Sequence, residues 1–173
     1  MEPDKIFTDR FSCRSFLKKE VPEEYIEAIL KAGIWAPSAG NLQPWRFLLI
    51  TNQELKEKLA EVAYGQEFIS EADFVVVVIA LPEESAIRYG ERGRNLYSIQ
   101  DTAAAIQNML LQASILGLGS CWVGAFSEER AKKVLNLEKN EKPVAILPFG
   151  FPKEFPPPLR KRKDLKKVVK KLE

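Results

Sequence analysis

The chain of 173 residues contains no histidine and only two cysteines, Cys13 and Cys121. Without imidazole it cannot build a Ser-His-Asp or Cys-His nucleophile, or a metal site with histidine ligands. Two isolated cysteines are too few for a zinc cluster and form no CxxC pair, and their scarcity agrees with a reducing compartment. If the protein is an enzyme, we therefore expect an organic cofactor to supply the chemistry.

Long hydrophobic runs are missing as well. The longest covers residues 74–81, whereas a membrane-spanning helix needs about 20 residues. The N-terminus mixes acidic and basic residues and lacks the apolar core of a secretory signal. We therefore expect a cytoplasmic protein without a membrane partner. The composition, with 46% hydrophobic and 29% charged residues, predicts a single globular domain over residues 1–173.

The net charge of +2 is unevenly distributed. Residues 153–173 hold nine basic and three acidic residues, so the rest of the chain is acidic. This basic arm predicts an anionic partner, namely a nucleic acid, a membrane surface or a phosphate group, although a solvated helix end has the same composition. The acidic body and the lack of aromatic residues among the basic ones argue against nucleic acid.

Hydrophobic periodicity and capping residues predict four strands and five helices. Strands are expected at residues 46–51, 74–81, 120–125 and 144–150, and helices at residues 21–35, 53–63, 98–116, 128–135 and 165–172. Strands and helices do not alternate strictly, so the pattern favours an α+β fold in which helices cover a sheet. The strand at 74–81 is apolar on both faces and should be central.

The helix expected at 98–116 is apolar around most of its circumference. Such a helix must be buried on nearly all sides, and a chain of this size has little interior to hide it. We infer that part of it contacts a second subunit. The alternative is a central helix inside a monomer.

The first candidate site is the segment Arg10-Phe11-Ser12-Cys13-Arg14. In an extended segment residues i, i+2 and i+4 point the same way, so Arg10, Ser12 and Arg14 can converge on one anion. Two guanidinium groups and a hydroxyl suit a phosphate monoester. The same pattern also occurs in ordinary surface loops.

Three further segments carry candidate binding residues. Residues 36–45 are rich in turn formers and polar amides, which suits the orientation of a flat heteroaromatic ligand, although the loop could be purely structural. Residues 117–124 hold three glycines but follow a helix and precede a strand, the reverse of a dinucleotide-binding turn. In this segment Gly124 would allow a ligand to approach the backbone. The basic residues 160–163 could complete the phosphate site of the first segment.

Together these motifs resemble the nitroreductase family of FMN-dependent flavoproteins. The resemblance runs from Arg10 to about Val169 and rests on RFSCRSF, APSAGNLQPWRF, DTAAAIQNMLLQASILGLGSCWVG and RKRK. It implies an α/β/α sandwich with a central, mostly antiparallel sheet covered by helices. It also implies an intertwined homodimer with FMN at the subunit interface. The implied reaction is a ping-pong hydride transfer from NADH or NADPH through FMN to a nitroaromatic, quinone or similar small acceptor.

The resemblance also implies roles for single residues. Arg10, Ser12 and Arg14 would hold the FMN phosphate and ribityl chain, and Arg160 and Arg162 would close on the same phosphate. A loop of the partner subunit would reach the flavin with Pro37, Ser38, Ala39 and Asn41. Gln66 would face the pyrimidine edge of the ring, and the backbone of Val123 and Gly124 would donate toward flavin N5. No protein acid, base or nucleophile is required.

Two departures from the family pattern limit this reading. Asp164 stands where the family more often has proline, and residues 82–97 are short where relatives line the substrate side. The acceptor, the choice between NADH and NADPH and the role of 82–97 therefore stay open. Alternative FMN reactions on the same fold are dehalogenation, dehydrogenation of small metabolites and flavin fragmentation. A non-catalytic module that binds flavin or nucleic acid is the alternative outside catalysis.

Overall fold

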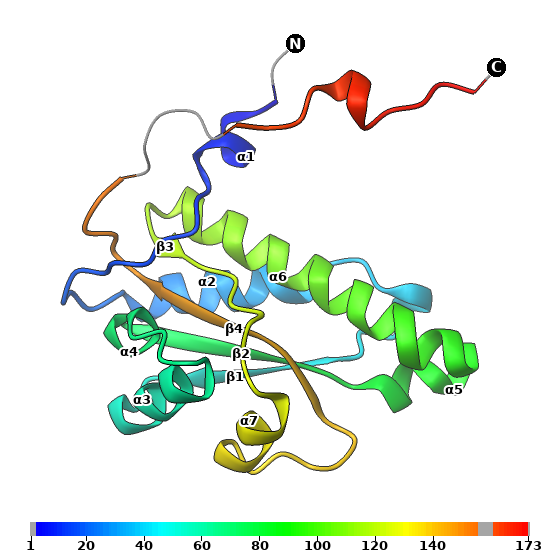
Figure 1. Ribbon diagram of the computed structural model, residues 1–173, viewed down its shortest axis with the longest axis horizontal. Coiled ribbons are helices and arrows are strands. Elements are labelled where there is room, and N and C mark those ends of the chain that lie inside the picture. The colour runs from blue at the N-terminus through cyan, green and yellow to red at the C-terminus, as the bar shows by residue number, and fades with distance from the viewer. Residues whose placement is uncertain (1–2, 156–160, 173) are drawn as a thin grey trace.

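The computed structural model describes residues 3–155 and 161–172, and its centre is a four-stranded sheet (Figure 1). The strands are β1 (Trp45–Ile50), β2 (Phe74–Ala80), β3 (Gly119–Ser120) and β4 (Lys142–Gly150). Their order is β1-β2-β4-β3, and each neighbouring pair is antiparallel. Every residue of β2 is buried, which confirms the prediction that this apolar run is a central strand.

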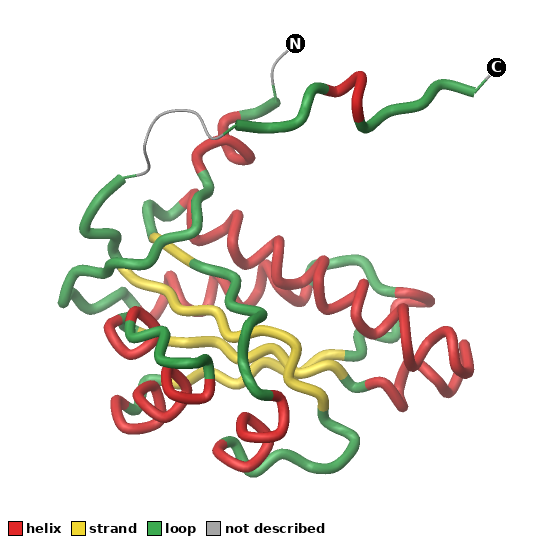
Figure 2. The backbone as a smooth tube through the Cα atoms, in the orientation of Figure 1, coloured by secondary structure: helices red, strands yellow, loops and turns green. Residues whose placement is uncertain are grey.

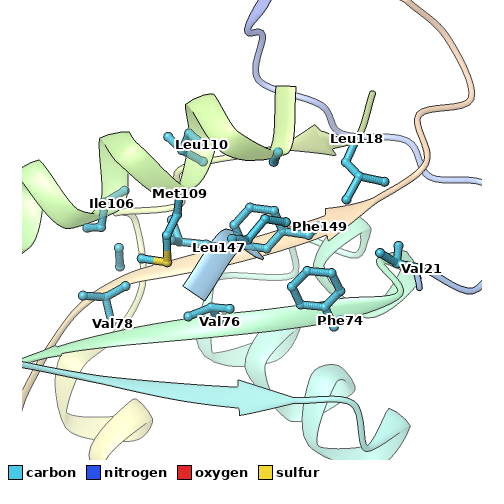
Figure 3. Close-up of a cluster of buried hydrophobic side chains, with 13 residues drawn as sticks. Val21, Phe74, Val76, Val78, Ile106, Met109, Leu110, Leu118, Leu147 and Phe149 are labelled. Carbon is cyan, nitrogen blue, oxygen red and sulfur yellow. The ribbon is translucent and has the colours of Figure 1, made fainter. Parts of the chain in front are cut away.

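β2 supplies side chains to two separate cores because successive residues of a strand point to opposite faces. Phe74, Val76 and Val78 belong to one cluster, and the residues between them belong to the other. In Figure 3, Val76 and Val78 point from β2 toward Met109. The sheet is therefore covered on both faces.

The first face is covered by α2 (Glu23–Ile34) and α6 (Ser98–Ile115). Pro22 precedes α2, and the acidic residues of its first turn favour the positive end of the helix dipole. The two helices pack closely where α2 has Gly33, since a methyl group there would lie 3.1 Å from atoms of Met109 and Phe47. The sequence-predicted helices at 21–35 and 98–116 are confirmed.

The second face is covered by α3 (Gln53–Val62), α4 (Phe68–Glu71) and α7 (Glu128–Val134), as Figure 2 shows. The predicted caps are present. The Asn52 side chain accepts from the Leu55 amide at 2.9 Å, and the Ser127 hydroxyl accepts from the Arg130 amide at 3.3 Å. With helices on both faces of an antiparallel sheet, the α+β fold expected as an α/β/α sandwich is confirmed.

Some expected elements differ from the structure. Of the expected strand at 120–125, only Ser120 lies in a strand, β3 (Gly119–Ser120), and Val123 adds an isolated bridge to Ile146. The terminal helix expected at 165–172 is a single 3-10 turn, η3 (Leu165–Lys167). Residues 161–172 lie away from the body and are all exposed (Figure 1). The apolar stripe of this segment has no surface to pack against, and a short helix is unstable alone.

Five elements were not predicted. These are α4 and, in addition, α1 (Lys5–Asp9), η1 (Ala39–Asn41), α5 (Pro82–Arg92) and the π-helical turn η2 (Gly93–Tyr97). The sequence of α5 is largely polar and lacks a clear apolar stripe, so hydrophobic periodicity does not predict it. Gly90 within it has non-helical backbone angles. Within the two described ranges, no helix is long and apolar enough to cross a bilayer.

The two-sided core gives a matched test of stability. Ile106 on α6 packs against the sheet and is 1% exposed, whereas Ile87 on α5 is 87% exposed. Ile106→Ala should lower the free energy of unfolding by about 2–5 kcal/mol because it leaves a cavity. Ile87→Ala, the same chemical change, should alter it by less than about 0.5 kcal/mol. Denaturant unfolding measures both, and equal losses would contradict this assignment of the core.

Candidate functional site

The segment around Arg10–Arg14 lies against the end of the sheet. Ser12 forms a parallel bridge with Ser120, and the Cys13 amide donates to the Ser120 carbonyl at 2.8 Å. Cys13 points into the protein and is 2% exposed, while Ser12 and Arg14 are exposed. The alternation expected from the sequence is therefore present, with Ser12 and Arg14 on the outer side.

The three predicted anion-binding residues, Arg10, Ser12 and Arg14, all lie near the thiol of Cys121. Burial raises the pKa of the Cys121 thiol. The positive charges of Arg14 and Arg10 and a hydrogen bond with Ser12 act in the opposite direction. All three side chains therefore lie near one buried thiol, beside β3. Their arrangement is a compact cationic site of the kind that binds phosphate.

The close approach of the two segments requires a glycine. A methyl group at Gly119 would lie 2.6 Å from the Cys13 sulfur, which no real side chain tolerates. Arg14 also places its guanidinium over the Phe68 ring, 6.0 Å from the centroid. Burial raises the pKa of Cys13 as it does that of Cys121, so neither thiol is an activated nucleophile.

Gln66, Val123 and Gly124 continue the site from β3. Gln66 donates its side-chain amide to the carbonyls of Ala63, at 2.9 Å, and Ala125, at 3.0 Å. It therefore ties the end of α3 to the segment that follows Gly124. Its amide hydrogens are used in these bonds, so the group it can present to a ligand is the side-chain oxygen.

The expectation that the amides of both Val123 and Gly124 donate to a ligand needs one correction. The Val123 amide donates to the Ile146 carbonyl at 3.0 Å, because this residue continues the pairing with β4. Gly124 is exposed, and a methyl group placed on it would meet nothing within 4 Å. Of the two residues, Gly124 is the one whose backbone is open to a ligand.

The second predicted group lies in the loop between α2 and β1. The Ser38 hydroxyl accepts from the Gln43 amide at 2.9 Å, and the Ala39 amide donates to Asp101 Oδ1 at 3.1 Å. Gly40 and Asn41 adopt positive φ angles of 59° and 55°. Pro37 and Asn41 are exposed. The loop is therefore a defined turn that presents polar groups at the surface.

The two groups lie at opposite ends of α6. Asp101, in the first turn of α6, holds the loop, whereas the Arg10–Arg14 segment pairs with β3 beyond the last turn. An 18-residue helix is about 27 Å long. Within one chain the loop and the Arg10–Arg14 segment therefore lie about one helix length apart.

The basic arm contributes less than expected to the described site. Arg160 lies outside the described residues. Arg162 is exposed and donates to the carbonyl of its neighbour Lys161 at 3.1 Å. Within residues 3–155 and 161–172, Arg162 forms no hydrogen bond or ion pair with the body of the chain. The same described ranges contain no group of three His, Cys, Asp or Glu side chains that could hold a metal ion.

Asp101 is a site residue that the sequence reasoning missed. It is 6% exposed, and its Oδ2 has no hydrogen-bond partner among the described residues. Burial raises the pKa of Asp101, and the hydrogen bond from the Ala39 amide opposes this effect. The available signal was a lone acidic residue in the first turn of a helix that is otherwise largely apolar.

Known proteins are similar to this chain in sequence and in fold. The family model described as the nitroreductase family matches residues 7–66 and 61–151. A protein of Archaeoglobus fulgidus with the provisional name NADH dehydrogenase/NAD(P)H nitroreductase is 35% identical over 87% of this chain and 85% of its own. The iodotyrosine deiodinase of Hydra vulgaris is 27% identical, over 95% of this chain and 70% of its own. A solved nitroreductase family protein of Clostridium novyi NT has a TM-score of 0.80 and 28% identity, covering 89% of this chain and 87% of that one.

Burial of Asp101 predicts a pH-dependent stability. A carboxyl whose pKa is higher in the folded state binds more protons there, so stability falls as pH rises from about 3.9, the value in an unfolded chain, through the folded value. Asp101→Asn keeps an oxygen for the Ala39 amide but removes the ionisation. The variant should therefore gain stability relative to the wild type as pH rises from about 4 to about 8. Thermal unfolding of both proteins across this range measures the difference, and parallel profiles would contradict the assignment.

Proposed function

The chain belongs to the nitroreductase family and is an NAD(P)H-dependent oxidoreductase, and on that premise we propose that FMN is its cofactor. When bound, FMN supplies the ring that takes hydride from NAD(P)H and passes it to a nitroaromatic, quinone or similar small acceptor in a ping-pong cycle. We place the protein in the cytoplasm, where reduced nicotinamide dinucleotides are available.

The observation that carries this proposal is the cationic cluster of Arg10, Ser12 and Arg14. All three residues lie near Cys121, which follows β3. Ser12 and Arg14 stand on the outer side of a buried backbone pairing. A dianionic phosphate monoester fits this donor set, because guanidinium groups bind phosphate with charge-assisted hydrogen bonds and the hydroxyl adds a neutral donor. The backbone pairing fixes their positions before a ligand arrives.

The neighbouring groups suit the flavin ring. The open backbone at Gly124 lets the ring approach, and its amide is the candidate donor toward N5. The free side-chain oxygen of Gln66 suits the N3–H donor of the pyrimidine edge. Gly124 follows Ser120, the bridge partner of Ser12, by four residues, and Gln66 is bonded to the carbonyl of Ala125. One FMN could therefore run from the phosphate site to these groups.

A second copy of the chain would complete the site. The loop with Pro37, Ser38, Ala39 and Asn41 lies at the far end of α6, so it can reach this ring from a partner subunit. Apolar side chains that a dimer would cover are exposed on α2, α6 and the arm: Ile34 51%, Trp35 83%, Ile115 60%, Leu165 71%, Val168 60%, Val169 58% and Leu172 80%. Exposed apolar patches of this kind mark interfaces. Residues 161–172, which lie away from the body of their own chain, would wrap the partner. Basic residues of the arm, including Arg160 and Arg162, would then approach a phosphate site.

A reductive dehalogenation is the second candidate reaction. It is supported by the similarity to the iodotyrosine deiodinase of Hydra vulgaris over 95% of this chain. Turnover assays with NADH and NADPH distinguish the two candidates. Coenzyme consumption with nitroaromatic or quinone acceptors supports the nitroreductase reaction, whereas consumption that occurs with haloaromatic acceptors alone supports dehalogenation. No contact among the described residues specifically favours dehydrogenation of small metabolites or flavin fragmentation.

Loss of one arginine should weaken FMN binding. Arg10→Gln and Arg14→Gln should each cost about 1.5–3 kcal/mol, or ~10- to 150-fold in Kd, because each removes a charge-assisted hydrogen bond to the phosphate. Flavin absorbance after dialysis reports the occupancy. Arg130→Gln on α7 removes the same charge from a helix on the second face of the sheet and should leave occupancy unchanged. Full occupancy in both site variants would show that the phosphate lies elsewhere.

The arm should contribute to a dimer. A Val168→Asp/Val169→Asp double variant places charges in a surface that we expect to be buried, so sedimentation should show dissociation at concentrations where the wild type is a dimer. Leu49→Asp changes a residue of β1 that is 45% exposed, away from the proposed interface, and serves as the control. A wild-type monomer that retains FMN through dialysis would contradict the shared site.

A further inference from the structure

Two arginines and two tyrosines form a continuous ladder on α5 and η2. The Arg88 guanidinium lies 5.5 Å from the centroid of the Tyr89 ring, and the Tyr89 and Tyr97 rings meet edge to face at 5.1 Å. Arg92 lies 5.3 Å from the Tyr97 centroid and donates through Nε to the Tyr97 hydroxyl at 2.9 Å. Aromatic packing thus restrains both arginines.

Among residues 3–155 and 161–172, no carboxylate forms an ion pair with either arginine of this ladder. Arg94, which follows closely in sequence, is held by Glu83 at 2.8 Å and also by Glu91. Arg88 and Arg92 are both exposed and form no ion pair in the described part of the chain. Glu84, one turn before Arg88, is exposed and does not pair with it. Arg94 is therefore held by carboxylates of its own chain, whereas Arg88 and Arg92 are available to bind an anion.

Backbone geometry fixes the ladder in place. Gly90 interrupts α5 with φ 53° and ψ −139°, and η2 then folds back on the helix. A methyl group at Gly93 would lie 2.4 Å from the Ser85 carbonyl oxygen, so the fold-back is as close as a glycine permits. This turn brings Tyr97 onto Tyr89 and sets the spacing of the two guanidinium groups.

The ladder lies against the loop that the proposed function places on the flavin. A methyl group at Gly40 would be 2.7 Å from the Tyr89 hydroxyl and 2.9 Å from Arg88 Nη1. Arg88 therefore packs on this loop, and the stacked rings of Tyr89 and Tyr97 link it to Arg92. If the loop reaches the flavin of a partner subunit, as the proposed function has it, both arginines come with it to the side from which a reduced nicotinamide dinucleotide would approach.

We propose that Arg88 and Arg92 bind the 2′-phosphate of NADPH and make NADPH the preferred electron donor over NADH. This inference rests on the proposed function, which sets the position of the flavin. The 2′-phosphate is a monoester with close to two negative charges at neutral pH, and two guanidinium groups match it better than one. NADH lacks this group and cannot form these charge-assisted hydrogen bonds, so the preference for NADPH comes from contacts that NADH does not make.

A binding experiment tests the arginines directly. Adenosine 2′,5′-bisphosphate and adenosine 5′-monophosphate are titrated into the purified protein by calorimetry, and they differ in the 2′-phosphate alone. We expect the bisphosphate to bind the wild type at least about tenfold more tightly. Arg88→Gln and Arg92→Gln should each remove most of this advantage. Arg130→Gln, which removes the same charge from α7, should keep it.

Steady-state kinetics give the second measurement. The ratio of kcat/KM for NADPH to that for NADH should exceed about ten in the wild type and fall toward one in Arg88→Gln and Arg92→Gln, with flavin absorbance unchanged. Equal affinity for the two nucleotides, or an advantage that survives in both variants, would overturn the inference. A protein that takes up no flavin would instead overturn the proposed function, and the nucleotide titration would still decide whether the arginines bind the 2′-phosphate.

Discussion

The pairing of residues 12–14 with the end of the sheet is the interaction on which the site depends. The bond from the Cys13 amide to the Ser120 carbonyl and the close contact of Cys13 with Gly119 hold an N-terminal segment against β3. Because an extended segment alternates, burial of Cys13 turns its neighbours Ser12 and Arg14 outward. The outward position of the residues proposed to bind phosphate therefore follows from the buried contact beneath them.

The length of α6 is the second constraint. The helix separates the loop at Ala39 from the cationic cluster by most of its 18 residues. It is buried where it faces the sheet, yet Ile115 at its end is 60% exposed, and residues such as Leu111 are half-buried. The same helix thus keeps the two parts of the proposed site apart within one chain and leaves apolar side chains exposed. A dimer would cover these side chains and would bring the loop of one chain to the cationic cluster of the other.

Regular periodicity made most of the fold predictable from the sequence. The four-valine strand at Val75–Val78, the cap at Asn52 and the cap at Ser127 are local signals, and each appears as expected. The outward positions of Ser12 and Arg14 were predictable because they depend on a two-residue alternation. Other features depend on contacts between distant segments, which no local pattern encodes. The hydrogen bond between Asp101 and the Ala39 amide, the use of the Val123 amide by β4 and the fold-back at Gly90 belong to this group. The arm illustrates the opposite case, since its apolar stripe predicts a helix but the body offers it no surface.

The distribution of charge explains how a protein without histidine can handle anionic reactants. The body of the chain is acidic overall, so its positive sites are local and act over about a Debye length, roughly 8–10 Å. Arg10 and Arg14 concentrate charge at one place, and Arg88 and Arg92 do so at another. In the proposed function, hydride transfer to a flavin would add negative charge to the cofactor, and fixed positive groups would lower the cost of that change without giving up a proton. Neither cysteine is activated, and the buried Asp101 is committed to the loop. The residues of the chain are therefore suited to binding and orienting charged molecules, while the overall acidity of the body disfavours binding of long polyanions.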